Sequence, residues 1–238
     1  MGWAGYFSAP LPGGVRQLEQ EFGLEVVAMP HALADADWLR RNPRARVDDW
    51  MAAFTDPDIQ AVFSTIGGDD AIRLLRYLDL DVLRDNPRIF MGFSDTTSLH
   101  LACYQAGLVS FYGPAIMTSF AENGGMMAYT VDSIRRTLFS AGPVGEVAPA
   151  RAGWTVEFLD WADPTLQEQK RSLNPPVGWT FLQGSGVRRG KLLGGCVEVL
   201  DWLPGTQVWP DLAAWQDAIL FLETSEDAPP PVVVSYHL

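Results

Sequence analysis

Ser94 is the residue of this 238-residue chain whose setting best suits it for chemistry. It follows the apolar run Arg88–Met91 and Gly92, and a helical run starts directly after it. A serine at such a strand-to-helix turn stands clear of the sheet, and the free N–H groups of the helix's first turn can stabilise negative charge beside it. The pattern Gly92-Phe93-Ser94-Asp95-Thr96 differs from the hydrolase elbow Gly-x-Ser-x-Gly at its last position. Ser94 is therefore either a nucleophile or the cap of the helix that follows.

A second turn between strand and helix lies upstream, at Gly67-Gly68. The buried strand predicted at Ala61–Ile66 ends there, and the helical run Ala71–Tyr77 follows. A glycine pair lets backbone N–H groups approach a ligand closely, so Gly67 could bind substrate and the pair could form an oxyanion hole. The acids that come next, Asp69 and Asp70, could select a substrate's amino group or cap the helix.

The two turns fit an α/β fold. Predicted strands at Leu24–Met29, Ala61–Ile66 and Arg88–Met91 alternate with helical spacing of apolar residues, as over Val47–Phe54. This βαβ order predicts a parallel sheet flanked by helices, with functional groups at the carboxyl ends of its strands. Because Gly68 and Ser94 both follow such ends, we expect them to face one crevice.

The second half of the chain has a different composition: Gly, Pro and Trp separate short runs in which apolar and polar residues alternate. The runs Trp154–Phe158 and Gly178–Leu182 predict strands. We therefore expect a nucleophile-bearing α/β domain over 1–140 and a smaller, partial, β-rich α/β domain over 145–238. Three tryptophans of this half either belong to the core or offer a flat surface to a ring-bearing substrate: Trp154, Trp161 and Trp179.

Composition excludes several classes of protein. A net charge of −12 argues against nucleic-acid binding, which rests on clustered Lys and Arg. The two cysteines, Cys103 and Cys196, read as buried free thiols rather than a disulfide framework. No His, Cys or carboxylate cluster has metal-ligand spacing and no dinucleotide fingerprint occurs, so we expect no metal and no cofactor. No apolar run is long enough to span a membrane, and a cytoplasmic location is the expectation.

Several motifs follow one another in an order typical of a known enzyme family. The chain from about Val15 to about Pro231 resembles the LD-carboxypeptidases, and within them the branch similar to the microcin C immunity peptidases. The stretches that carry the resemblance are Ser64–Asp70, Met91–Thr97, Val109–Pro114, Leu193–Cys196 and Ile219–Glu223.

The resemblance implies a serine hydrolase with a Ser-Glu-His triad. Ser94 matches the family's nucleophile and Glu223 its acidic member, and the N–H groups of Gly68 and Asp95 would form the oxyanion hole. The substrate would be a peptide with an unusual terminal group, either the D-amino acid of a cell-wall peptide or a peptidyl-nucleotide such as a microcin C-like antibiotic. Pairing with a second copy of the chain stays open.

The triad histidine is the member that the sequence does not supply. In the family it follows the acidic residue by several tens of residues, whereas this chain ends fifteen residues after Glu223. His31 lies in a surface connection, His100 packs or points away on the helix after Ser94, and His237 is next to the last residue. The final Val232–Leu238 departs from the helix that the family begins after its prolines.

Both ends of the chain therefore indicate truncation. Residues 1–10 lead almost at once into the helix around Val15, so the first strand of the sheet is expected to be missing. We expect a serine-peptidase pocket that hydrolyses its substrate poorly or not at all. Two alternatives remain: a non-catalytic binding protein or remnant that keeps the pocket, and an unrelated α/β domain in which Ser94 only caps a helix.

Overall fold

The computed structural model describes residues 11–161 and 163–237, which form two compact units that are not continuous in sequence. Of the described residues, the first unit joins 28–115 to 188–237, and the second joins 11–27 to 116–161 and 163–187. Each unit is described by itself. The division of the chain into domains over 1–140 and 145–238 stays a prediction.

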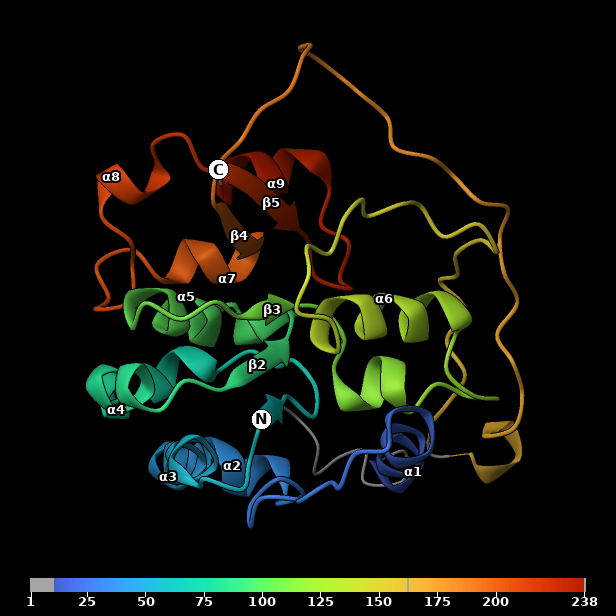
Figure 1. Ribbon diagram of the computed structural model, residues 1–238, viewed down its shortest axis with the longest axis horizontal. Helices are drawn as coiled ribbons and strands as arrows, with labels where there is room; N and C mark the ends of the chain where they lie inside the picture. The colour runs from blue at the N-terminus through green and yellow to red at the C-terminus, as the bar shows by residue number, and fades with distance from the viewer. Residues whose placement is uncertain (1–10, 162, 238) are drawn as a thin grey trace. The chain divides into compact units, whose positions relative to one another are not determined.

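A parallel sheet forms the centre of the first unit (Figure 1). Its strands are β1 (Ala61–Phe63), β2 (Ile89–Gly92) and β3 (Phe111–Tyr112), in the order β1-β2-β3. Phe63 pairs with Met91 and Gly92 pairs with Tyr112, so both junctions are parallel. The prediction of a mixed α/β fold with a parallel sheet and flanking helices is confirmed.

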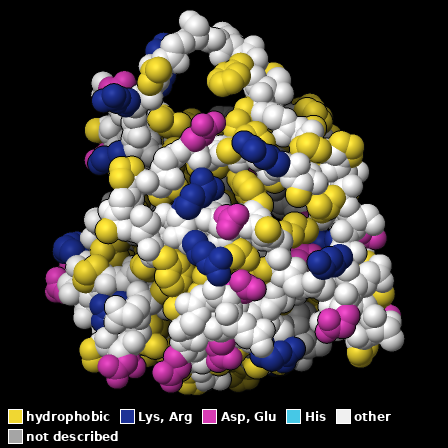
Figure 2. Space-filling view, turned by 45° about the vertical axis from the view of Figure 1, so that its right-hand side comes forward, with side chains coloured by type: hydrophobic (Ala, Val, Ile, Leu, Met, Phe, Trp, Pro, Cys, Tyr) yellow, Lys and Arg dark blue, Asp and Glu magenta, His cyan; other side chains and the backbone are white. Residues whose placement is uncertain are grey.

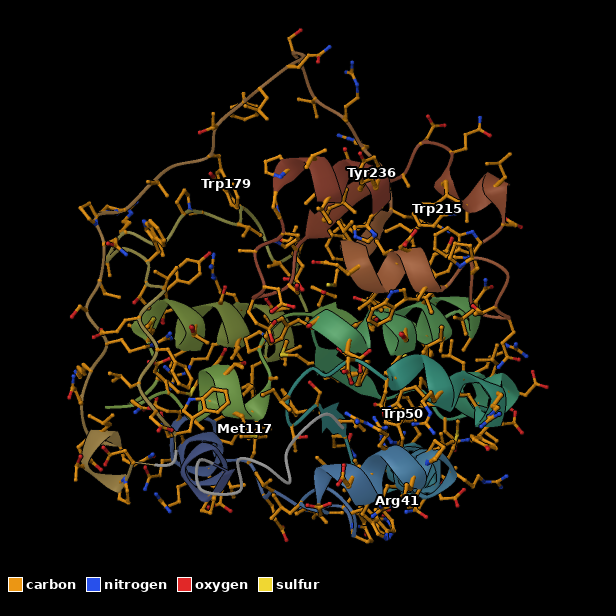
Figure 3. The ribbon with its side chains drawn as sticks, turned by 180° about the vertical axis from the view of Figure 1, so that it is seen from behind. Arg41, Trp50, Met117, Trp179, Trp215 and Tyr236 are labelled. Carbon is orange, nitrogen blue, oxygen red and sulfur yellow. The ribbon has the colours of Figure 1, made fainter. Side chains whose placement is uncertain are left out.

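Helices of the first half of the chain cover this sheet. In α3, Val47, Trp50 and Phe54 recur at helical spacing and are all buried, which fixes the face that the helix turns to the core. Trp50, labelled in Figure 3, comes from this helix. It packs edge-on against Phe90 of β2, with 5.5 Å between ring centroids. The helical segments are α2 (Ala36–Arg41), α3 (Pro43–Thr55), the 3-10 helix η2 (Ala71–Tyr77), α4 (Leu80–Asp85), the 3-10 turn η3 (Ser94–Thr96) and α5 (Thr97–Gln105).

A second pair of strands belongs to the same unit. β4 (Leu192–Cys196) and β5 (Ile219–Glu223) pair in parallel, and Cys196 lies opposite Glu223. Leu193 and Cys196 of β4 enter the same apolar core as Phe90 and Leu99. The accompanying helices are α7 (Val197–Trp202), α8 (Leu212–Trp215) and α9 (Pro231–His237).

The second unit contains helices and long connections. Its elements are α1 (Leu11–Phe22), the π-helical turn η4 (Ile116–Phe120), α6 (Ala128–Leu138) and the 3-10 turn η5 (Pro164–Leu166). Phe22 of α1 contacts Phe120 edge-on and stacks on Phe139. Arg171, in the connection after η5, donates two hydrogen bonds to the buried Glu122 carboxylate, at 2.6 and 2.7 Å. These bonds hold the connection against the core of this unit.

Three predicted strands are not strands in the structure. Leu24–Met29 has no strand pairing although its exposed and half-buried residues largely alternate, because alternation alone does not provide a neighbouring strand for its backbone groups. Of Trp154–Phe158 only Trp154 makes a bridge, to Asn174. Gly178–Leu182 is exposed along its length, with Phe181 and Leu182 more than nine-tenths accessible, so the region between 145 and 190 is not β-rich.

The end of the chain also differs from expectation. Residues 231–237 form α9, so the interpretation that Val232–Leu238 departs from a helix after the prolines is wrong. Pro231 starts the helix, where a missing N–H costs nothing. The expectation that a first strand is missing concerns residues 1–10, which lie outside the described residues.

Other general expectations can be compared with the structure. Cys103 and Cys196 are buried free thiols, as predicted. In the part of the chain that the structure describes, no helix is both long and apolar enough to cross a bilayer. On the face shown in Figure 2, basic side chains are interspersed with acidic ones.

Candidate active site

Ser94 lies at a sharp turn between β2 and the helical segments η3 and α5. Its φ of +59° falls in the left-handed region, which is uncommon for residues other than glycine and is found preferentially at functional sites. Gly92 makes the turn possible, since a Cβ there would lie 2.5 Å from Ser64 Oγ and 2.8 Å from Thr96 Oγ1. Thr96 Oγ1 in turn donates to the carbonyl of Phe93 at 2.8 Å, which closes the turn around Ser94.

The glycine pair after β1 lies directly beside this serine. A Cβ on Gly67 would be 3.1 Å from Ser94 Oγ and 3.7 Å from the backbone nitrogen of Asp95. Gly68 follows with a φ of +151°, a conformation that glycine adopts without strain. The two turns that the sequence singled out therefore meet. Asp69, the residue after Gly68, is exposed.

The Asp95 side chain holds the two turns together. Its Oδ2 accepts the N–H groups of Asp70 and Ala71, at 3.1 and 2.9 Å, and thus caps η2 from outside. Asp70 makes no side-chain cap and pairs instead with Arg46 at 2.8 Å, so capping by Asp70 is not what the structure shows. Burial raises the pKa of Asp95 from 3.8 to about 6, against the lowering effect of its two backbone hydrogen bonds.

Glu223 ends β5 and reaches the same turn from the other strand pair. Its Oε1 accepts the Tyr112 hydroxyl at 2.5 Å and the Ser94 N–H at 3.2 Å. The structure therefore brings Glu223 to the serine across 129 residues of sequence. The family resemblance, rather than any local pattern, led us to expect Glu223 on the same side as the serine; its hydrogen bond to the Ser94 N–H was not part of that expectation.

Tyr112 is the member of this site that the sequence analysis did not identify. Its hydroxyl accepts the Ser94 N–H at 2.8 Å while it donates to Glu223. Burial, reinforced by the neighbouring Glu223 carboxylate, raises the pKa of Tyr112 well above its ordinary value of 10.0, so the phenol keeps its proton. The signal was present in the motif Val109–Pro114, which contains this tyrosine.

Each histidine of the chain has its own partner elsewhere. His100 is buried, with Nε2 2.9 Å from the carbonyl of Gly92 and Nδ1 2.8 Å from Ser110 Oγ. Burial lowers its pKa to about 4. His31 pairs with Asp49 at 3.0 Å, and His237 of α9 lies 3.1 Å from Asp201 of α7. Within the described residues, no hydrogen bond joins a histidine to Ser94 or Glu223.

Comparison with known proteins decides what this arrangement belongs to. The model of the LD-carboxypeptidase N-terminal domain matches residues 4–113, and that of the C-terminal domain matches residues 189–234. The crystal structure of the MccF-like protein from Streptococcus pneumoniae in complex with AMP superposes with a TM-score of 0.85 at 31% identity, over 98% of this chain and 71% of that one. This chain belongs to the LD-carboxypeptidase family.

Other members of the LD-carboxypeptidase family are similar over shorter parts of their length. The microcin C7 self-immunity protein MccF of Escherichia coli is 31% identical over 76% of this chain and 52% of that protein. The structure of MccF in complex with aspartyl sulfamoyl adenosine has a TM-score of 0.71 at 27% identity, over 91% of this chain and 63% of that one. The chain spans about half the length of the curated relatives that it matches first.

Proposed function

We propose that the chain carries a serine-peptidase site of the LD-carboxypeptidase type, directed at a peptide joined to a nucleotide. One observation carries the proposal: Ser94, on a strained turn, lies against Gly67 and shares a hydrogen-bond network with Glu223. A nucleophile, nearby backbone N–H groups and a carboxylate are the parts that acyl transfer needs.

The chemistry would follow the usual course of a serine hydrolase. Ser94 Oγ attacks the carbonyl carbon of an amide, and the resulting oxyanion is held by the N–H groups of Gly68 and Asp95. The amine leaves with a proton, an acyl-enzyme forms, and water releases it. Glu223 would orient the base that takes the serine proton, and Gly67 would lie against the bound substrate.

The substrate class is argued from the relatives. An MccF-like relative binds AMP, and MccF itself binds aspartyl sulfamoyl adenosine, a nucleoside with an attached aminoacyl group. We therefore favour a peptidyl-nucleotide over the second candidate, a cell-wall peptide that ends in a D-amino acid. The exposed Asp69 is close enough in sequence to Gly68 to select an amino group on either substrate.

Turnover by this chain should be slow. A neutral serine is a weak nucleophile without a base within hydrogen-bond reach, and the three histidines are engaged by Asp49, Ser110 and Asp201. Loss of one triad member lowers kcat by about 10⁴- to 10⁶-fold. The alternative function is consequently a binding protein that uses the same site and performs no hydrolysis.

Calorimetric titration tests the site and its ligand class without requiring turnover. We expect AMP and aspartyl sulfamoyl adenosine to bind and a D-alanine-terminated tetrapeptide to bind less well. Gly67→Ala should weaken nucleotide binding about tenfold or more, because its Cβ would lie 3.1 Å from Ser94 Oγ. Gly178→Ala is the matched control, since a Cβ there meets no atom within 4 Å.

The same titration can overturn the proposal. The proposal of a nucleotide site is contradicted if neither AMP nor aspartyl sulfamoyl adenosine binds. It is also contradicted if Gly67→Ala weakens the binding no more than Gly178→Ala does. Tight binding of the tetrapeptide alone would favour the cell-wall substrate.

A further inference from the structure

We propose that Tyr112 is a positioning residue of this site: its hydroxyl fixes the Glu223 carboxylate against the Ser94 turn. The inference rests on the proposed function only for the catalytic role of Glu223 and Ser94. The hydrogen bonds that carry it are properties of the chain itself.

The hydroxyl of Tyr112 has its full set of partners. A phenol has one proton to donate and accepts hydrogen bonds on its oxygen. The proton goes to Glu223 Oε1 at 2.5 Å, because an ionised carboxylate can only accept. The oxygen accepts the Ser94 N–H at 2.8 Å and lies 3.2 Å from Thr97 Oγ1.

In the remaining hydrogen bond, between Thr97 and Tyr112, Thr97 is the donor. Thr97 Oγ1 accepts the N–H of Cys196 at 3.0 Å, which leaves its own proton free to point at the Tyr112 oxygen. This contact requires a close approach of β4 to α5. Gly195 allows the approach, since a Cβ there would lie 2.5 Å from Thr97 Oγ1. Cys196, Thr97 and Tyr112 thus each donate one hydrogen bond in this series, and the Glu223 carboxylate accepts the last one.

The ring of Tyr112 is held as firmly as its hydroxyl. It packs edge-on against Phe221, which stands two residues before Glu223 on β5, with 5.0 Å between centroids. It also contacts His100 of α5 at 5.1 Å. Tyr112 therefore lies between α5 and the strand that ends in Glu223, and it links the three-stranded sheet to the β4–β5 pair of the first unit.

The register of β3 explains why this side chain reaches the turn. Tyr112 pairs with Gly92, two residues before Ser94, at the carboxyl end of β2. Parallel strands end at the same edge of a sheet, so the tyrosine and the serine turn lie at the same level. No local pattern near Ser94 encodes this contact, which spans 18 residues of sequence.

The first consequence is a fixed orientation of the Glu223 carboxylate at the end of β5. Its Oε1 accepts two hydrogen bonds from the first sheet and the turn after it, from the Tyr112 hydroxyl at 2.5 Å and from the Ser94 N–H at 3.2 Å. Removal of the phenol hydroxyl takes away the shorter of these two contacts and also one acceptor of the Ser94 N–H.

The test is an NMR measurement on the full chain without ligand, at one fixed pH. Glutamate carboxyl carbons and backbone amides are labelled, and Glu223→Gln identifies the carboxyl resonance. In Tyr112→Phe we expect the Glu223 carboxyl carbon and the Ser94 amide proton to shift, because each loses its hydrogen bond to the phenol. Tyr104→Phe, a partly buried tyrosine of α5 outside this network, should leave both resonances in place. Unchanged resonances in folded Tyr112→Phe would overturn the proposal.

A second substitution keeps the hydroxyl and therefore the fold. Replacing Tyr112 with 3-fluorotyrosine gives a more acidic phenol and a stronger donor, so the Glu223 carboxyl resonance should move in the direction opposite to that expected for Tyr112→Phe. No movement would overturn the proposal even if Tyr112→Phe fails to fold. Because neither experiment uses a ligand or turnover, the inference and the proposed function fail separately. Calorimetry decides the function, and the Glu223 and Ser94 resonances decide the role of Tyr112.

Discussion

The strands β2 and β5 both end at the candidate active site, but their surroundings differ. Phe90 and Met91 of β2 are 2% and 3% exposed, and the strand has a neighbour on each side. In β5, Leu220 and Leu222 are 56% and 44% exposed, and the strand pairs with β4. Burial of apolar surface is the dominant stabilising contribution in folding. Core packing therefore fixes the Ser94 side of the site, whereas the Glu223 side depends on strand register and on hydrogen bonds to Tyr112 and Ser94.

The difference teaches that the two halves of one site can be specified by different physical means. A buried strand tolerates little displacement, because close-packed interiors transmit any change in volume. A half-exposed strand can shift unless polar contacts hold its end. Variants in the two strands should consequently affect different properties, and the following expectations proceed from the largest effect to the smallest.

The largest effect should come from Phe90→Ala. Phe90 contacts Trp50 at 5.5 Å and His100 at 4.8 Å, so truncation leaves a cavity beneath the Ser94 turn. The free energy of unfolding should fall by about 3–5 kcal/mol. Urea unfolding followed by tryptophan fluorescence measures it, and a loss below about 1 kcal/mol would mean that β2 is not the rigid side of the site.

The next effect concerns acid stability and His100. Its folded pKa of about 4 lies below the ordinary 6.5, so the unfolded chain binds more protons between these values. The stability contributed by neutral His100 is therefore complete above about pH 6.5 and is lost as the pH falls toward 4, by about 3 kcal/mol.

Urea unfolding of wild type and His100→Gln at pH 7 and pH 4.5 measures this loss. The stability advantage of wild type should shrink by most of that amount, since all other titrating groups are shared and cancel in the difference. A pH-independent advantage would show that His100 is not buried as a neutral group.

Asp95→Asn should have a smaller effect of the opposite sign. The folded pKa of Asp95, about 6, is above its ordinary 3.8, so ionisation of this buried carboxylate costs stability above pH 6 and costs nothing below about pH 4. The shift corresponds to about 3 kcal/mol. An asparagine oxygen can still accept the N–H groups of Asp70 and Ala71.

The asparagine also places a buried NH₂ at the position of Asp95 Oδ1, an atom that has no hydrogen-bond partner. This unpaired donor should cost about 1 kcal/mol of stability and so reduce the gain. We therefore expect a gain of about 2 kcal/mol at pH 7.5 that becomes a loss of about 1 kcal/mol by pH 4, where only the unpartnered NH₂ still matters. Thermal unfolding across this range measures it. Destabilisation at pH 7.5 would mean that the charge itself holds the two turns together.

The smallest effect should come from Leu220→Ala on β5. With more than half of its surface exposed, this side chain loses little burial, and the change should stay under about 1 kcal/mol. Leu193→Ala, in the buried neighbour strand β4, is the matched control and should cost about 2–5 kcal/mol. Equal losses in the two variants, measured by urea unfolding, would contradict the contrast between buried and exposed strands.

The parts of the molecule that local sequence determines could be predicted. The Ser94 turn depends on Gly92, an apolar strand and a following helix, all within a dozen residues, and the turn is where the sequence places it. Leu24–Met29 and Gly178–Leu182 have strand-like composition, but β structure needs a partner strand that no local pattern supplies. Strand pairing is the step at which local reasoning fails.

The site shows the same limit. Glu223 could be named only through resemblance to a family, because its contact with Ser94 joins residues 129 positions apart. Tyr112 lay in a recognised motif, yet its role depends on the register of β3 against β2 and on the approach of β5. Such long-range contacts follow from tertiary packing and have no local signature.

The central claim is that Ser94 and Glu223 form a peptidase site whose base is not supplied by His31, His100 or His237. Release of product from aspartyl sulfamoyl adenosine, compared between wild type, Ser94→Ala and His237→Ala, tests it most directly. The account predicts turnover at least about 10⁴-fold below that of MccF assayed in parallel. Robust turnover that both substitutions abolish would show that His237 completes the triad, and would contradict the account.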